Sequence, residues 1–232
     1  MIGVYDFTVI LTYMSMISGC TGIIMSMTGI GHPYIGALFL MLSGLCDAFD
    51  GMVARKKKNR TELEKRFGVQ IDSMSDLIAF GMLPLAIGVA MLRVSTRFSD
   101  KPFWMNETKY VWYPILLIAI GIAYGLAGMI RLAYFNATED ERAAEAEEKG
   151  KQYFTGLPIT TAALVFPFVL ILHYYVRFDF SIVYYVVMAV LAALFLGKFK
   201  FRKPGFIGIM IQVAIGLAEF VTIVCILLSY RL

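Results

Sequence analysis

The sequence predicts an all-α fold: a polytopic bundle of transmembrane helices that forms one domain over residues 1–232. The first observation is that 59% of the residues are hydrophobic and the mean hydropathy is +0.72, which is far more apolar than a soluble domain. The second is that stretches of ~20 mostly apolar residues, long enough to cross a bilayer, recur along the whole chain. We predict about seven spans, with six or eight as alternatives because two of them lie close together near residue 178. The predicted spans are residues 8–30, 34–54, 69–92, 111–135, 158–176, 180–197 and 206–230.

The first span does not have the pattern of a cleavable signal, because no basic segment precedes it and no A-x-A site follows it. The three cysteines, Cys20, Cys46 and Cys225, all fall inside apolar spans. They therefore indicate no disulfide framework.

The distribution of basic residues predicts the orientation in the membrane. The connection at residues 55–68 holds seven Lys and Arg residues, and the connections at 137–157 and 198–205 hold three and four. Cytoplasmic loops are enriched in Lys and Arg. We therefore expect a multi-pass protein of the cell membrane with these loops and the N-terminus in the cytoplasm.

Four aspartates lie inside predicted spans. Asp47 and Asp50 are near the end of the second span, and Asp72 and Asp76 are near the start of the third. Each would cost ~2.5–3.5 kcal/mol at the centre of a transmembrane helix, so a set of four indicates function. Spacings of three and four residues put each pair on one helix face. Two antiparallel helices would then bring the pairs together at matching depths, toward the cytoplasmic ends.

Four carboxylates this close predict a divalent metal site. At an effective dielectric near 20, two charges ~5 Å apart repel by ~3 kcal/mol, so either protons or cations must reside among them. Hard ions such as Mg²⁺ or Mn²⁺ prefer oxygen ligands, and the set has room for two ions. Zinc is disfavoured because no His or Cys accompanies the aspartates.

Small and basic residues continue the two carboxylate faces. Gly51 and Ala54 share a face with the first aspartate pair, and Gly68 shares one with the second. They would allow a ligand, or simply the partner helix, to approach the backbone closely. Arg55 extends the first face and has the geometry to bind a phosphate.

Taken together, residues 47–55 (DAFDGMVAR) and 68–76 (GVQIDSMSD) resemble the signature of CDP-alcohol phosphatidyltransferases, D-x-x-D-G-x-x-A-R followed by G-x-x-x-D-x-x-x-D. All eight signature residues are present over residues 47–76. The spacer between Arg55 and Gly68 is twelve residues, longer than is usual in this family.

The resemblance implies that the four aspartates hold metal and that Asp76 is also the general base. It implies that Gly51, Ala54, Arg55 and Gly68 line the CDP pocket, and it implies a homodimer. The run Thr12-Tyr-Met-Ser15 stands where the family often has T-x-x-N, which makes Ser15 a candidate contact to the nucleotide.

Further runs resemble the phosphatidylserine synthases of this family, which act in phospholipid biosynthesis. These runs are SDLIAFG at 75–81, RLAYFN at 131–136 and FTGLP at 154–158. The resemblance implies transfer from a CDP-activated lipid, either CDP-diacylglycerol or CDP-archaeol, to the hydroxyl of L-serine with release of CMP. Arg131 would then bind the serine carboxylate, assisted by Asn136 and the backbone at Gly156; alternatively, Arg131 is an interfacial anchor.

Two other functions remain open from the sequence. A member of the same family with inositol phosphate or glycerol phosphate as acceptor would use extra cations near the pocket, and the basic connection at 55–68 offers them. A cation transporter would also place carboxylates in the membrane. Transport, however, does not account for the spacing of the glycine, alanine and arginine residues.

Overall fold

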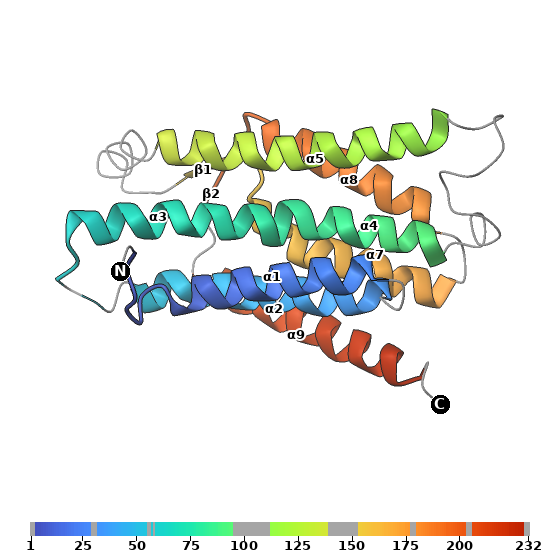
Figure 1. The fold of residues 1–232 in the computed structure, drawn as a ribbon, viewed down its shortest axis with the longest axis horizontal. Coiled ribbons are helices and arrows are strands. Elements are labelled where there is room, and N and C mark those ends of the chain that lie inside the picture. Colours follow the sequence, from blue (N-terminus) through green and yellow to red (C-terminus); the bar gives the residue numbers. More distant parts are fainter. Residues whose placement is uncertain are drawn as a thin grey trace.

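The computed structural model of the chain describes residues 3–28, 32–54, 57, 59–94, 112–138, 153–176, 180–202 and 206–229. Its helices run side by side in one bundle, except that α9 diverges from the others toward its C-terminal end (Figure 1). The helices are α1 (Ile10–Met27), α2 (Pro33–Ala54), α3 (Glu62–Asp76), α4 (Leu83–Val94), α5 (Trp112–Ala137), α7 (Ala162–Val176), α8 (Ser181–Leu196) and α9 (Phe206–Ser229). A π-helical segment, η1 (Leu77–Met82), joins α3 to α4, and a 3-10 turn, η3 (Ile159–Thr161), precedes α7.

The predicted fold class is confirmed. Within the described ranges, six helices are long and apolar enough to cross a membrane, counting Glu62–Val94 as one continuous helix, and α8 is a shorter apolar helix of 16 residues. In addition, and not predicted, two strands of three residues pair antiparallel. They are β1 (Tyr153–Thr155) and β2 (Lys200–Arg202), in a register that places Phe154 opposite Phe201.

The bundle has one end at which the candidate functional elements gather. The N-terminus, the end of α2, the start of α3, the end of α5 and the two strands all lie at this end (Figure 1). We call it the polar end, since Asp6 in the N-terminal segment, Lys57 after α2 and Thr61 at the start of α3 form a polar network there. This agrees with the alternating directions predicted for the spans, because the basic connections flank these same elements.

Helix α1 packs closely on α2 and on the α3–η1–α4 helix, and small residues make this possible. A Cβ atom at Gly19 would come within 3.1 Å of the Ala79 backbone, and one at Gly22 within 2.8 Å of the Leu83 side chain. Ser18 also donates a hydrogen bond to the carbonyl of Phe39 in α2, at 2.8 Å. Helices in a membrane gain no hydrophobic free energy by associating, so they pack through close contacts between small residues.

Buried tyrosines hold the other helices by hydrogen bonds to backbone carbonyls. Tyr124 of α5 donates to the carbonyl of Phe80 in η1 at 2.6 Å, and Tyr184 of α8 donates to that of Pro84 at 2.8 Å. Both rings are fully buried. The first bond satisfies a carbonyl in the π-helical segment, where the regular α-helical pairing is interrupted. The segment that follows Asp76 is thus held in place by α5.

Candidate active site

The structure brings three of the four predicted aspartates together. One carboxylate oxygen from each of Asp47, Asp50 and Asp72 lies within 4.8 Å of the other two. The three side chains are half-buried at the polar end, where α2 ends and α3 begins its course into the bundle. The donor atoms are all oxygens, as a hard divalent cation requires.

Asp76 lies deeper than the other three. It is 8% exposed, and it is the last residue of α3, just before η1. It does not belong to the group of three oxygens that lie within 4.8 Å of one another. Its neighbour Ser75 donates a hydrogen bond to the Thr12 carbonyl of α1, at 3.1 Å, which ties this turn of α3 to α1.

Helix α1 contributes a threonine to the carboxylate cluster. The Thr12 hydroxyl donates to Asp50 Oδ2 at 3.4 Å. Ser15, the residue chosen from the sequence as a nucleotide contact, is instead buried against α2. Its hydroxyl lies 3.5 Å from the Ser43 carbonyl, and the Ser43 hydroxyl donates to the Ser15 carbonyl at 3.0 Å. Thr12 is one turn nearer the polar end, in the same T-x-x-S run, and its contact with Asp50 was not predicted from the sequence.

The remaining candidates for the nucleotide pocket lie at the polar end of α2 and α3. Gly51 and Ala54 occupy the last turn of α2 and are half-buried, whereas Arg55 lies outside the described residues. Gly68 is one turn before Asp72 in α3. A Cβ atom at Gly68 would lie 2.7 Å from Nη2 of Arg60, so the space that this glycine leaves open is next to an arginine.

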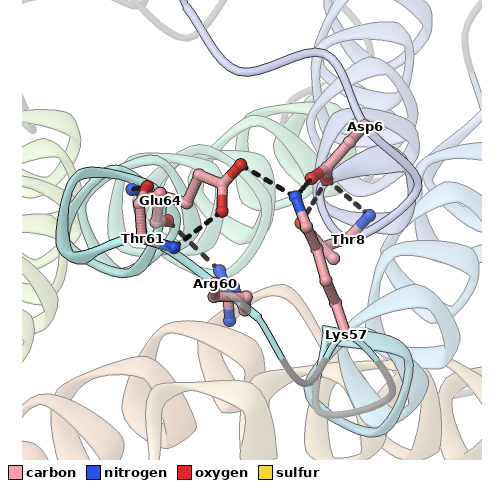
Figure 2. A network of polar contacts seen from close by, with 6 residues as sticks. All are labelled: Asp6, Thr8, Lys57, Arg60, Thr61 and Glu64. Atoms are coloured by element: carbon pink, nitrogen blue, oxygen red, sulfur yellow. Dashed lines mark hydrogen bonds and ion pairs between the residues drawn. The ribbon is translucent and has the colours of Figure 1, made fainter.

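A polar network closes the connection between α2 and α3 (Figure 2). Lys57 donates to Asp6 at 2.7 Å and to Glu64 at 2.8 Å, and so joins the N-terminal segment to α3. Thr61 and Glu64 form a capping box that starts α3. The Lys57 ammonium group, with the Thr8 hydroxyl, lowers the pKa of Asp6 to about 2. Asp6 is therefore ionised at neutral pH.

The predicted serine-binding residues occupy two places on α5 and its neighbours. Arg131 is 6% exposed, and its Nε and Nη2 groups donate to the carbonyls of Leu157, at 3.2 Å, and Gly156, at 3.4 Å. Its guanidinium carbon lies 5.4 Å from the centre of the Phe135 ring. Asn136 instead donates to the Ser73 hydroxyl at 2.8 Å, beside Asp72. The end of α5 is thereby fixed to the carboxylate-bearing turn of α3.

Gly156 holds the segment that Arg131 contacts. Its φ is +74°, and its N–H donates to the carbonyl of Phe199 at 2.8 Å. A Cβ atom there would lie 2.8 Å from the Gly197 oxygen and 3.1 Å from the Phe195 oxygen. Only glycine combines this backbone conformation with such close approach.

We expect Gly156→Ala to destabilise the protein. The left-handed conformation alone costs a residue with a Cβ about 1–2 kcal/mol, and the two carbonyl oxygens add a steric cost. Thermal unfolding in detergent is the measurement. Gly125→Ala in α5 is the matched control, because a Cβ atom there would lie 3.8 Å from Met82 Sδ, an ordinary van der Waals contact. A Gly156→Ala protein that unfolds at the wild-type temperature would contradict the prediction.

The comparisons with known proteins agree with the pattern of this site. The sequence model of the CDP-alcohol phosphatidyltransferase family matches residues 7–199, so the chain belongs to that family. It is 32% identical over 162 residues to the CDP-diacylglycerol–serine O-phosphatidyltransferase of Saccharomyces cerevisiae, covering 66% of this chain and 50% of that protein. It is 30% identical over 155 residues to the archaetidylserine synthase of Methanothermobacter thermautotrophicus, covering 67% and 53%.

A bacterial relative shows the same likeness over a shorter stretch. The CDP-diacylglycerol–serine O-phosphatidyltransferase of Bacillus subtilis is 29% identical over 127 residues, which is 55% of each chain. The chain thus spans about half the length of the curated relatives it matches. No solved structure gives a significant match.

Proposed function

We propose that this protein transfers a phosphatidyl-type group from a CDP-activated lipid to the hydroxyl of L-serine and releases CMP. The observation that most supports this is the cluster of Asp47, Asp50 and Asp72, whose oxygens lie within 4.8 Å of one another at the ends of two adjoining membrane helices. The names of the relatives, which include serine phosphatidyltransferases and an archaetidylserine synthase, favour serine as the acceptor.

The carboxylate cluster fits a divalent metal ion. Its donors are oxygens only, and three half-buried acids this close need a positive charge or protons between them. Asp47, Asp50, Asp72 and Asp76 would hold the metal, which we propose to be two ions of Mg²⁺ or Mn²⁺. Such ions, when bound, would neutralise charge on the pyrophosphate of the donor.

The protein's own residues would then orient the two substrates and move one proton. Asp76 would accept the proton of the serine hydroxyl as its oxygen bonds to the lipid-side phosphorus, while the bond from that phosphorus to the CMP oxygen breaks. The burial of Asp76 supports this role, because a base that is shielded from water is less able to activate a water molecule in place of the serine hydroxyl. Gly51, Ala54, Arg55 and Gly68 would contact the CDP group.

The serine carboxylate needs a cation, and Arg131 is the candidate. Two of its donor groups are fixed on the carbonyls of Gly156 and Leu157, which would hold the guanidinium in one orientation. Asn136 would assist from the turn that carries Ser73. We further propose a homodimer in the cell membrane, with the polar end in the cytoplasm, where the basic connections predict it to be.

The test is a transfer assay with purified protein in detergent. CDP-diacylglycerol or CDP-archaeol is supplied with labelled L-serine, with and without Mn²⁺ or Mg²⁺, and parallel reactions contain inositol phosphate or glycerol 3-phosphate. We expect labelled lipid and CMP to form only when metal is present and only when serine is the acceptor. Product from a phosphorylated alcohol instead would contradict the serine assignment. No CMP release with any of these acceptors would contradict the transferase proposal itself.

A further inference from the structure

Arg60 belongs to the twelve-residue spacer between the two halves of the signature, and its guanidinium contacts a backbone carbonyl. Its Nη2 group donates to the Glu64 carbonyl at 3.2 Å, while its Nε is buried and has no hydrogen-bond partner in the described part of the chain. Among the described residues no carboxylate pairs with it. A buried charged donor that lacks a partner is costly, so it indicates a ligand that would supply one.

The two acids of the polar network that includes Arg60 already receive hydrogen bonds from other groups. Glu64 receives Lys57 on Oε1 and the Thr61 backbone N–H on Oε2. Asp6, on the far side of the network, receives Lys57 and Thr8 (Figure 2). Lys57 therefore lies between two carboxylates, whereas the Arg60 guanidinium donates to a neutral carbonyl and, among the described residues, to no carboxylate.

The position of Arg60 places its charge beside the carboxylate cluster. Its Nη2 lies 2.7 Å from the point where Gly68 would carry a Cβ atom. Gly68 and Asp72 are four residues apart in α3, on the same face and ~6 Å apart along the helix axis. Arg60 thus lies about one helical turn from the aspartates, toward the polar end.

We propose that Arg60 binds an oxyanion of the substrate, and specifically the pyrophosphate of the CDP-activated lipid; this inference rests on the function proposed above. A pyrophosphate carries more charge than a carboxylate and must lie next to the aspartates for transfer to occur. An arginine one turn away has the planar set of donors that suits a phosphate. In this arrangement Gly68 leaves room for the Arg60 side chain and the phosphate together. The serine carboxylate is the other possible source of the same chemistry.

The experiment measures nucleotide binding and turnover separately in Arg60→Gln and Arg60→Lys. Gln keeps a donor for the Glu64 carbonyl without the charge, and Lys keeps the charge without the planar fork. Lys65→Gln is the matched control, because Lys65 also lies in this basic segment but is 55% exposed and pairs with Glu62. The probes are CDP, titrated calorimetrically in the presence of Mg²⁺ or Mn²⁺, and L-serine in the transfer assay. Unfolding temperatures of all three variants establish that each is folded.

We expect Arg60→Gln to weaken CDP binding by about 10- to 100-fold, as the loss of a hydrogen bond to a charged group does. The salt dependence of CDP binding should also fall, Arg60→Lys should recover part of the affinity, and Lys65→Gln should bind as the wild type does. The KM for serine should stay within about two-fold of the wild type.

Wild-type CDP affinity in a folded Arg60→Gln protein would overturn this inference and leave the proposed function standing. If the KM for serine is raised in the same protein, Arg60 is assigned to the acceptor carboxylate. If the wild-type protein binds no CDP with either metal, the proposed function fails, and this inference fails with it.

Discussion

Asp76→Asn is expected to reduce kcat for lipid transfer by about 10²- to 10⁴-fold, the range that general base catalysis contributes. Asparagine has the same shape as aspartate but does not accept the serine proton. Asp76 is buried at the junction of α3 and η1. The measurement is the initial rate of CMP release with saturating CDP-lipid and serine.

The control for this variant is Glu62→Gln, which makes the same chemical change on α3 at a side chain that is 77% exposed. It should retain wild-type turnover. A folded Asp76→Asn protein that keeps more than about a tenth of the wild-type kcat would assign the base to another residue.

Removal of divalent metal is expected to abolish transfer, and Asp50→Asn is expected to raise the metal concentration needed to restore it. Loss of even an outer-shell partner costs a metal site about 10- to 100-fold in affinity, and Asp50 would be a direct ligand. Activity is measured after chelation and then during titration with Mn²⁺ or Mg²⁺. Metal binding itself is followed by the rise in unfolding temperature, since a ligand at 100 times its Kd stabilises the folded state by ~2.7 kcal/mol.

The thermal measurement separates the metal site from the chemistry. In the wild type the unfolding temperature should rise with metal even when no substrate is present, and in Asp50→Asn this rise should need more metal. Full activity in the presence of excess chelator would contradict the proposed metal dependence. An unfolding temperature that is equally sensitive to metal in both proteins would remove Asp50 from the site.

The sequence was sufficient to predict the bundle and the core of the candidate site. Apolar runs of ~20 residues have few structural alternatives in a membrane, because a helix satisfies its own backbone. Carboxylates inside such runs are costly enough to indicate a shared site, and Asp47, Asp50 and Asp72 do lie together. Their spacing along two helices was all the information that this prediction needed.

The sequence did not predict contacts that depend on how two helices are offset along their axes or on the path of a loop. Whether Ser15 or Thr12 lies beside Asp50 is decided by the position of α1 along α2, and the Ser15–Ser43 pair fixes that position. The position of Arg60 over Gly68 depends on a spacer with no periodic pattern. The pairing of β1 with β2 joins segments more than forty residues apart, which local sequence does not indicate.

The π-helical segment has a consequence for how this helix can change in evolution. Six residues, Leu77–Met82, separate the turn that carries Asp72 and Asp76 from the apolar α4. A π-turn accommodates one more residue than an α-turn, so it offsets the side-chain register of α3 from that of α4. Deleting one residue there would restore a regular helix and rotate one half against the other by about 100°. Either the aspartates would turn away from α2 or α4 would lose its packing, so the length of this segment is constrained even where its side chains are free to vary.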